Sequence, residues 1–199
     1  MKRIICSIIT LCSLTVAMAG NPQKAEQKQI ASEAKEYAKQ GWKVTPGSLS
    51  MTDQIKRGWQ IERELDEEGL NKWVVAEGKS IGTAYNSARM QSMTVAKNEL
   101  AGKMSTEMTT LVEQKLGNDE VGMESVSQTI QASKGRFTQK LGRINTLMEC
   151  YRDLPDGRVE VLIRIAYPYE KAMKAMRDAV KENGGDSEIG NRLNEIMGW

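Results

Sequence analysis

Hydrophobic residues recur every three or four positions over much of this chain, a spacing that is typical of amphipathic helices. The longest such stretch, Ala84–Leu116, contains no proline and one interior glycine, Gly102. At 1.5 Å per residue, an unbroken helix over this range would be about 50 Å long. Gly117-Asn118 is expected to end it. The residues predicted to form its buried face are Ala84, Ala88, Met93, Ala96, Leu100, Met104, Met108 and Leu111.

Two shorter helices are predicted before this one. Gln23–Gln40 is polar with a thin apolar stripe, and Gly41 is expected to cap its C-terminus. A short extended piece, Trp42–Val44, follows it. The next helix is predicted from about Thr52 to Asp66. Its inward-facing residues are expected to be Met51, Ile55 and Trp59.

A first strand is predicted at Trp73–Gly78, and Gly78 and Gly82 are expected to form the turn at its exit. Phosphate-binding loops occur at such a junction between a strand and a helix. Here, however, Lys79 and Ser80 precede the second glycine, whereas the nucleotide-binding motif places them after it. A turn at the end of the strand is therefore favoured, and an anion at the following helix N-terminus remains an alternative.

The strongest hairpin signal is the turn sequence Leu154–Gly157, in which proline presets the turn and glycine accepts a positive φ. It joins a predicted strand at Ile144–Asp153 to a second at Val159–Ile165, where apolar and charged residues alternate. This alternation predicts a half-buried strand with its apolar face on helices. In the first hairpin strand it places Thr146, Met148 and Cys150 on one side.

Three more helices complete the pattern. One is predicted at Asp119–Gln139, with a possible break at Gly135, and another at Tyr169–Glu182. A flexible break at Asn183–Asp186 then precedes a short terminal helix, Ser187–Trp199.

This order of elements predicts the α+β class, with a small antiparallel three-stranded sheet packed against the long helix and covered by helices on one side. Additional helices precede the sheet. We expect a signal peptide at residues 1–19 and an N-terminal helical region at 20–70. The α+β domain is expected at 71–182, followed by a C-terminal tail at 183–199.

The first residues change the functional picture, because they read as an export signal. Lys2 and Arg3 precede the uncharged run Ile4–Val16, and Ala17–Ala19 has the small-x-small pattern that signal peptidase cleaves. The apolar run is about 13 residues, whereas a bilayer span needs about 20, so no transmembrane span is expected after cleavage.

Neither Cys6 nor Cys12 follows the small residue that a lipoprotein signal requires. A periplasmic protein is therefore expected, with association with the outer membrane or secretion left open.

Composition excludes several function classes. The chain has 28 basic and 26 acidic residues, and loss of Lys2 and Arg3 with the signal leaves 26 of each. A neutral exported protein is not expected to bind nucleic acid. The chain has no histidine, which excludes serine–histidine and cysteine–histidine catalysis and histidine metal sites. Cys150 is the single cysteine after the signal, and we interpret it as a buried small apolar residue.

Other residues that could carry chemistry have simpler structural interpretations. Methionines at helical spacing could hold Cu(I), but on an apolar face they are expected to fill the core. The tryptophans, among them Trp42, Trp59 and Trp73, are interpreted as core anchors, and the role of Trp199 is left open. The acidic cluster around Glu64 lacks the spacing of a calcium loop and is interpreted as a solvated helix end. The methionines considered are Met90, Met93, Met104 and Met108.

Two segments give the chain a family resemblance. Trp73–Ser80 is a strand that ends in glycine, and the helix after it carries spaced alanines and the run Ala96-Lys97-Asn98-Glu99-Leu100-Ala101. Together with the hairpin Met148–Ile165, this order resembles the LPP-twenty lipoprotein family of bacterial envelopes, and the N-terminal domain of flagellar assembly protein T is similar. The resemblance covers Lys72–Met176. It implies an exported, non-enzymatic α+β module of envelope assembly, and it supplies no catalytic residues.

We therefore expect an exported non-enzymatic envelope protein that binds another envelope protein or itself, with no catalytic, cofactor or metal residues assigned. The long helix and the arm Gln23–Asp66 are the expected contact surfaces. The alternative is a periplasmic small-ligand or lipid-binding protein, or an unusual enzyme that uses carboxylates. The carboxylates available for such an enzyme are Asp53, Glu62, Asp66 and Glu77.

Overall fold

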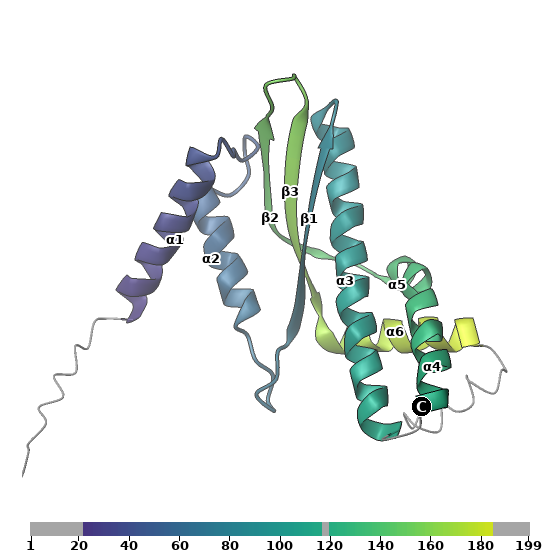
Figure 1. Cartoon of the computed structure of the whole chain (residues 1–199). Coiled ribbons are helices and arrows are strands. Elements are labelled where there is room, and N and C mark those ends of the chain that lie inside the picture. The colour runs from purple at the N-terminus through teal and green to yellow at the C-terminus, as the bar shows by residue number, and fades with distance from the viewer. Residues whose placement is uncertain (1–21, 117–119, 185–199) are drawn as a thin grey trace, which may run out of the picture.

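A computed structural model of the chain describes residues 22–116 and 120–184 (Figure 1). The predicted signal peptide, the Gly117-Asn118 break and the helix predicted at Ser187–Trp199 lie outside the described residues. The elements are α1 Pro22–Lys39, α2 Met51–Glu62, β1 Trp73–Gly82, α3 Tyr85–Leu116, α4 Glu120–Ala132, α5 Lys134–Lys140, β2 Asn145–Asp153, β3 Val159–Pro168 and α6 Tyr169–Gly184.

The three strands form one antiparallel sheet in the order β1-β3-β2, with β3 in the centre. The β2–β3 hairpin turns at Gly157, which has φ +80°, and Asp156 Oδ1 accepts the backbone N–H of Arg158 at 3.1 Å. The α+β class, the three-stranded sheet and the long helix on it are therefore as predicted. No helix of the described ranges has the length and apolarity needed to cross a membrane.

The long helix α3 packs directly onto β1, because glycines on the strand allow a close approach. A Cβ at Gly78 would lie 2.0 Å from the carbonyl oxygen of Ser92, and one at Gly82 would lie 2.7 Å from the amide of Ala88. The prediction that the strand ends at Gly78 is therefore wrong. Gly78 lies inside a strand that continues to Gly82, and it serves helix packing rather than a turn.

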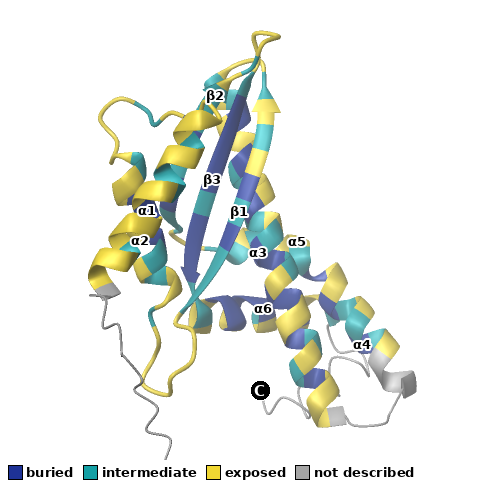
Figure 2. Cartoon of the chain, turned by 60° about the vertical axis from the view of Figure 1, so that its left-hand side comes forward, coloured by how far each residue is buried: buried dark blue, intermediate teal, exposed yellow. Residues whose placement is uncertain are grey.

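The main core lies between α3, α6 and this face of the sheet. Leu100, Met104 and Met108 of α3 are almost fully buried, and so are Ile163 and Ile165 of β3. Figure 2 shows buried residues along most of β3 and along the inner side of α6.

The other face of the sheet carries α1 and α2, so the prediction that helices cover one side is wrong. A second buried cluster joins these helices to the sheet and consists of Ile30, Trp42, Ile55, Met148, Cys150 and Leu162. The sheet is thus the middle of three layers, as Figure 1 shows. The sequence did not predict the α1–α2 layer, because the charged residues on β3 suggested that this face of the strand is exposed to solvent.

Two features of the N-terminal part are as predicted. Gly41 has φ +83°, and beside it the Trp42 amide donates to the carbonyl of Tyr37 at 3.0 Å, which caps α1. The predicted extended piece Trp42–Val44 places Lys43 against β2, where it forms an isolated bridge with Tyr151.

Several boundaries differ from the prediction for local reasons. Helix α2 ends at Glu62 rather than Asp66, because Asp66 closes a turn by accepting the amides of Glu68 and Leu70. The break predicted at Gly135 lies at Ser133, whose hydroxyl donates to the Thr129 carbonyl at 2.7 Å.

In β2, an irregularity between Thr146 and Met148 shifts the register. Thr146 therefore does not share a side with Met148 and Cys150, as strict alternation predicted.

Candidate functional site

The outer edge of β1 lies alongside α3, and side chains of α3 bind its backbone. Lys103 Nζ donates to the carbonyl oxygen of Val75 at 2.7 Å, and Glu99 Oε2 accepts the amide of Glu77 at 3.1 Å. Lys103 and Glu99 also form an ion pair at 3.0 Å. Two side chains one helical turn apart thus occupy the position that a neighbouring strand would take.

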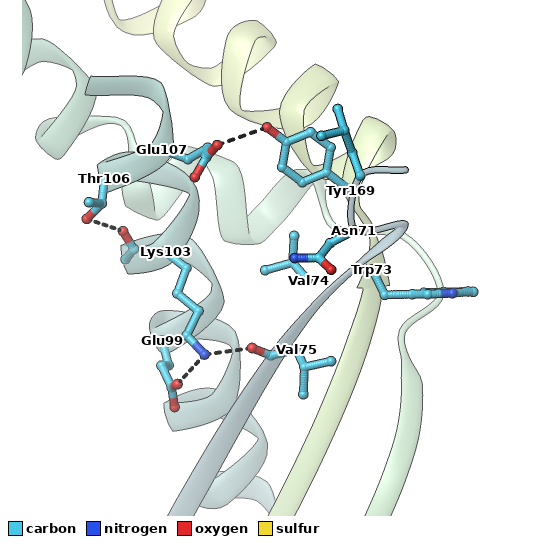
Figure 3. Close-up of a pocket in the computed structure, with 11 residues that line it drawn as sticks. Asn71, Trp73, Val74, Val75, Glu99, Lys103, Thr106, Glu107 and Tyr169 are labelled. Carbon is cyan, nitrogen blue, oxygen red and sulfur yellow. Dashed lines mark hydrogen bonds and ion pairs between the residues drawn. The ribbon is translucent and has the colours of Figure 1, made fainter. Parts of the chain in front are cut away.

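A groove of about 810 Å³ lies between this edge and α3 (Figure 3), and we call it the β1–α3 groove. Its floor is apolar and its rim is polar, with Lys103, Glu99 and Glu107 along the helix side. The residues that line it are Leu70, Asn71, Trp73, Val74, Val75, Glu99, Gly102, Lys103, Thr106, Glu107 and Tyr169.

Specific contacts hold the aromatic residues of the groove in place. The indole of Trp73 points away from α3 (Figure 3), and its Nε1 donates to Glu64 Oε2 at 2.7 Å. The hydroxyl of Tyr169 donates to Glu107 Oε1 at 3.2 Å, and its backbone amide donates to the carbonyl of Lys72 at 2.9 Å. Burial, together with the negative charge of Glu107, raises the pKa of Tyr169, so its phenol remains a neutral donor. The groove is therefore preorganised by groups on β1, α3 and α6.

A smaller hollow of about 380 Å³ adjoins the groove and shares Val75, Glu99 and Lys103 with it. Arg164 of β3 lies there between two carboxylates. Its Nη2 is 3.0 Å from Glu77 Oε2, and its Nη1 is 3.6 Å from Glu62 Oε1. The structure therefore brings together two of the four carboxylates considered for catalysis, with an arginine between them.

The other two carboxylates lie elsewhere and have structural roles. Asp53 is in the first turn of α2, where its Oδ2 accepts the hydroxyl of Ser50 at 2.6 Å. Asp66 closes the turn after α2. The acidic cluster around Glu64 lies in the loop after α2 rather than on a helix end. Within the described ranges, no group of three or more histidine, cysteine, aspartate or glutamate residues could hold a metal ion.

The Gly78–Gly82 segment is neither a phosphate loop nor a strand-exit turn. All its residues pair with β3, from Gly78 opposite Ile163 to Gly82 opposite Val159. The prediction of a turn at this segment is therefore wrong, because a glycine that allows a helix to pack closely gives the same sequence pattern as a glycine in a turn.

The methionines and tryptophans divide between the core and the surface. Met104 and Met108 are buried as predicted, whereas Met90 is 71 % exposed. Trp42 is 6 % exposed and anchors the second cluster, while Trp73 is half-buried in the groove wall and is not the core anchor that we expected. Trp199 lies outside the described residues.

Cys150 is fully buried in the second cluster, which agrees with its interpretation as a small apolar residue. Burial raises the pKa of its thiol to about 12, so the thiolate needed for nucleophilic or redox chemistry is scarce at neutral pH.

One polar cluster was missed by the sequence reasoning. Glu149 of β2 accepts hydrogen bonds from the hydroxyl of Tyr85 and from Arg89 Nε, the latter at 2.7 Å. Burial and the bond to Glu149 raise the pKa of Tyr85 to about 12. The spacing of Tyr85 and Arg89, one helical turn apart, was the available signal, but it does not identify a partner on a distant strand.

Comparisons of the chain with models of protein families, with curated proteins and with solved structures give no match. The resemblance to the LPP-twenty family therefore rests on the residues of this sequence alone.

Proposed function

We propose that this protein is an exported, non-enzymatic module of the bacterial envelope, and that the β1–α3 groove binds a segment of another envelope protein. One observation carries the proposal: a preorganised groove with an apolar floor and a charged rim runs along an open edge of the sheet. Such a combination suits a polypeptide, which presents apolar side chains and polar backbone groups together.

The chemistry of the neighbouring hollow supports binding rather than catalysis. Arg164 pairs with Glu77 at 3.0 Å and with Glu62 at 3.6 Å, so both carboxylates of the hollow are engaged in ion pairs. With no histidine in the chain and a buried Cys150, the residues offer little else for a catalytic site.

Export is supported by Lys2, Arg3 and the apolar run that ends at Ala17–Ala19. The resemblance to the LPP-twenty family supports an envelope role, since it covers the strand, the long helix and the hairpin that form the groove side of the sheet.

A second candidate is favoured by the size of the groove. Its volume lies within the range of small-molecule sites, and Val74 and Tyr169 offer apolar surface to a lipid or another small ligand (Figure 3). A periplasmic ligand-binding protein is therefore the alternative.

The test is a comparison of two arginine variants in the tagged full chain. Thr106→Arg places a long side chain in the groove, whereas Gln114→Arg adds the same charge to an exposed position on α3 outside it. After crosslinking in the native envelope, wild type and Gln114→Arg are expected to retain the same partner, and Thr106→Arg is expected to lose it. Equal retention by both variants, or a product without cleavage after Ala19, would count against the proposal.

A delipidated envelope extract separates the two candidates. If wild type retains a lipid but no protein, and Thr106→Arg loses that lipid, the ligand-binding alternative is correct.

A further inference from the structure

We propose that the outer edge of β1 accepts an extended segment of a partner polypeptide as a fourth strand, which displaces the side chains of Glu99 and Lys103. This inference rests on the proposed binding function and adds the mode of recognition.

The backbone of β1 offers a ladder of hydrogen-bonding groups on its outer side. In an antiparallel pair, alternate residues point both their N–H and C=O toward the same neighbour. The backbone groups of Val75 and Glu77 that bind α3 side chains point away from β3. The backbone N–H and C=O of Lys79 and Ile81, two and four residues after Glu77, therefore point to the same outer side. Residues 22–116 and 120–184 supply no hydrogen-bond partner for the outward groups of Lys79 and Ile81.

The half of the β1 edge near Val75 is covered only by two side chains of α3, and a partner strand could displace both. The side chains of Lys103 and Glu99 are 50 % and 40 % exposed, and their mutual ion pair links adjacent turns of one helix. Exposed pairs of this kind contribute little to stability, so an incoming strand can replace both contacts with backbone hydrogen bonds.

Hollows for side chains lie along the same edge. The β1–α3 groove flanks its first half, and a second hollow of about 430 Å³ flanks the other half. Exposed apolar residues line this second hollow: Met90 is 71 % exposed and Val95 is 43 % exposed. Side chains on one face of an added strand would therefore find apolar pockets beside α3. The second hollow is lined by Ser80, Met90, Gln91, Thr94 and Val95.

The opposite edge of the sheet shows the same mode of contact made by the chain itself. The backbone of Lys43 exchanges both hydrogen bonds with Tyr151 of β2, at 2.7 Å and 2.8 Å. Gln54 Oε1 accepts the next outward amide, that of Glu149, at 2.7 Å. The edge of β2 is therefore occupied by Lys43 and Gln54 of this chain, and the edge of β1 is the one left for a partner.

The occupant we infer is a segment of a different protein rather than β1 of a second copy. Two-fold pairing over the open stretch would centre near Ser80 and bring both Lys79 side chains to the same face, where like charges repel. A partner strand with apolar residues toward α3 and an acidic or polar residue opposite Lys79 avoids this cost.

Proline at an outward-facing position provides the test. Ile81→Pro removes one outward N–H and leaves the bonds between β1 and β3 intact, whereas Ile81→Thr shortens the same side chain and keeps the donor. Lys79→Pro and Lys79→Gln form a second matched pair at the next outward position. The urea midpoint of each variant checks that the fold is preserved.

The probe is a phage-displayed library of linear peptides selected on the full-length wild-type protein. Binding of the recovered peptides is expected to weaken about tenfold with Ile81→Pro or Lys79→Pro, roughly the loss of 1.4 kcal/mol, and to change little with Ile81→Thr or Lys79→Gln. Amide exchange of Lys79 and Ile81 is expected to slow in the complex. Replacing both Glu99 and Lys103 by alanine is expected to tighten binding.

Failure of this inference is distinct from failure of the proposed function. If Thr106→Arg abolishes binding of an envelope partner while both proline variants retain it, the groove function stands and strand addition is wrong. Recovery of no peptide, or of peptides that ignore the proline substitutions, overturns the inference. A dimer in light scattering that Ile81→Pro converts to a monomer also overturns it, because the occupant is then a second copy.

Discussion

On the α3 side of the sheet, contact is made mainly by apolar surfaces in close approach, whereas on the α1–α2 side polar groups contribute a larger share beside a smaller apolar cluster. The α3 side joins a continuous core of α3, α6 and the three strands, in which backbone meets backbone at Gly78. The α1–α2 side has a smaller apolar cluster, and beside it Gln54 hydrogen-bonds the amide of Glu149 and Arg164 pairs with Glu62 of α2 across the layer.

This difference separates two ways of fixing a helix on a sheet. Close packing leaves no space for added atoms, so the α3 side should be most sensitive to changes that enlarge a side chain. Buried polar contacts tolerate volume changes better, but they cost free energy when one partner is removed. The α1–α2 layer is therefore the part of the fold whose attachment depends on individual hydrogen bonds.

The largest expected effect is that of Gly78→Ala. The added methyl group would lie 2.0 Å from the carbonyl oxygen of Ser92 and 2.4 Å from the amide nitrogen of Ala96, and both are backbone atoms that cannot rotate away. We expect a loss of about 3 kcal/mol or more in the free energy of unfolding, measured by urea denaturation.

Gly102→Ala is the matched control in α3. A Cβ at Gly102 meets no atom within 4 Å, and alanine favours helix, so this variant should be more stable by about 0.5–1 kcal/mol. Similar destabilisation by both substitutions would show that close packing at Gly78 is not what distinguishes the α3 side.

The second expected effect probes the polar layer. Gln54 is 5 % exposed, and its side chain binds the amide of Glu149 at 2.7 Å and the carbonyl of Leu49 at 2.8 Å. Gln54→Leu keeps most of the volume but leaves both backbone groups without their partner. We expect a loss of about 2 kcal/mol in the free energy of unfolding, with faster amide exchange in α2 than in α3.

Gln60→Leu makes the same substitution on the exposed side of α2. It should leave the free energy of unfolding almost unchanged. If Gln54→Leu were equally harmless, the α1–α2 layer would be held by its apolar cluster, and the contrast between the two sides would disappear.

A smaller effect is expected from pH, through Glu149 on the α3 side. Burial opposes ionisation of this carboxyl, but hydrogen bonds from Arg89 and Tyr85 outweigh it and hold its pKa below the ordinary value of 4.5. A lowered pKa contributes stability that is present above that ordinary value and is lost as the pH falls through the pKa of the folded state.

The urea midpoint of wild type should therefore fall between neutral pH and about pH 3 more steeply than that of Glu149→Gln, which lacks the titrating group. Parallel pH profiles for the two proteins would show that the hydrogen bonds to Glu149 contribute nothing to stability.

The sequence predicted the α3 side of the sheet better than the α1–α2 side. The α3 side was predictable because spaced alanines and methionines identify one helix face, and the Pro155–Gly157 turn identifies the hairpin. The α1–α2 layer was not predictable, because the charged residues Arg164 and Glu160 alternate with apolar residues on β3, which is the pattern of a strand with one face in solvent. They are covered because Glu77 and Arg152 pair with them, and pairing between distant segments leaves no local signal.

The candidate site was harder to predict than the fold. Trp73 was interpreted as a core anchor and the long helix was expected to be a contact surface, but the groove depends on which turn of α3 lies beside the edge of β1. Glu99 and Lys103 show only helical spacing in the sequence. Their function in covering a strand edge follows from the register of packing, which the glycines at 78 and 82 set.

The smallest expected effect tests close packing within α3 itself, at two serines that are both fully buried. Ser92 Oγ lies 2.8 Å from the carbonyl oxygen of Val161, whereas the hydroxyl of Ser105 has no hydrogen-bond partner in the described part of the chain. Ser92→Ala should lower the free energy of unfolding by about 1 kcal/mol, and Ser105→Ala should raise it by up to about 1 kcal/mol, because it removes an unsatisfied polar group. Urea denaturation distinguishes these opposite signs. A loss of stability with Ser105→Ala would mean that this hydroxyl has a partner and is not an unsatisfied polar group.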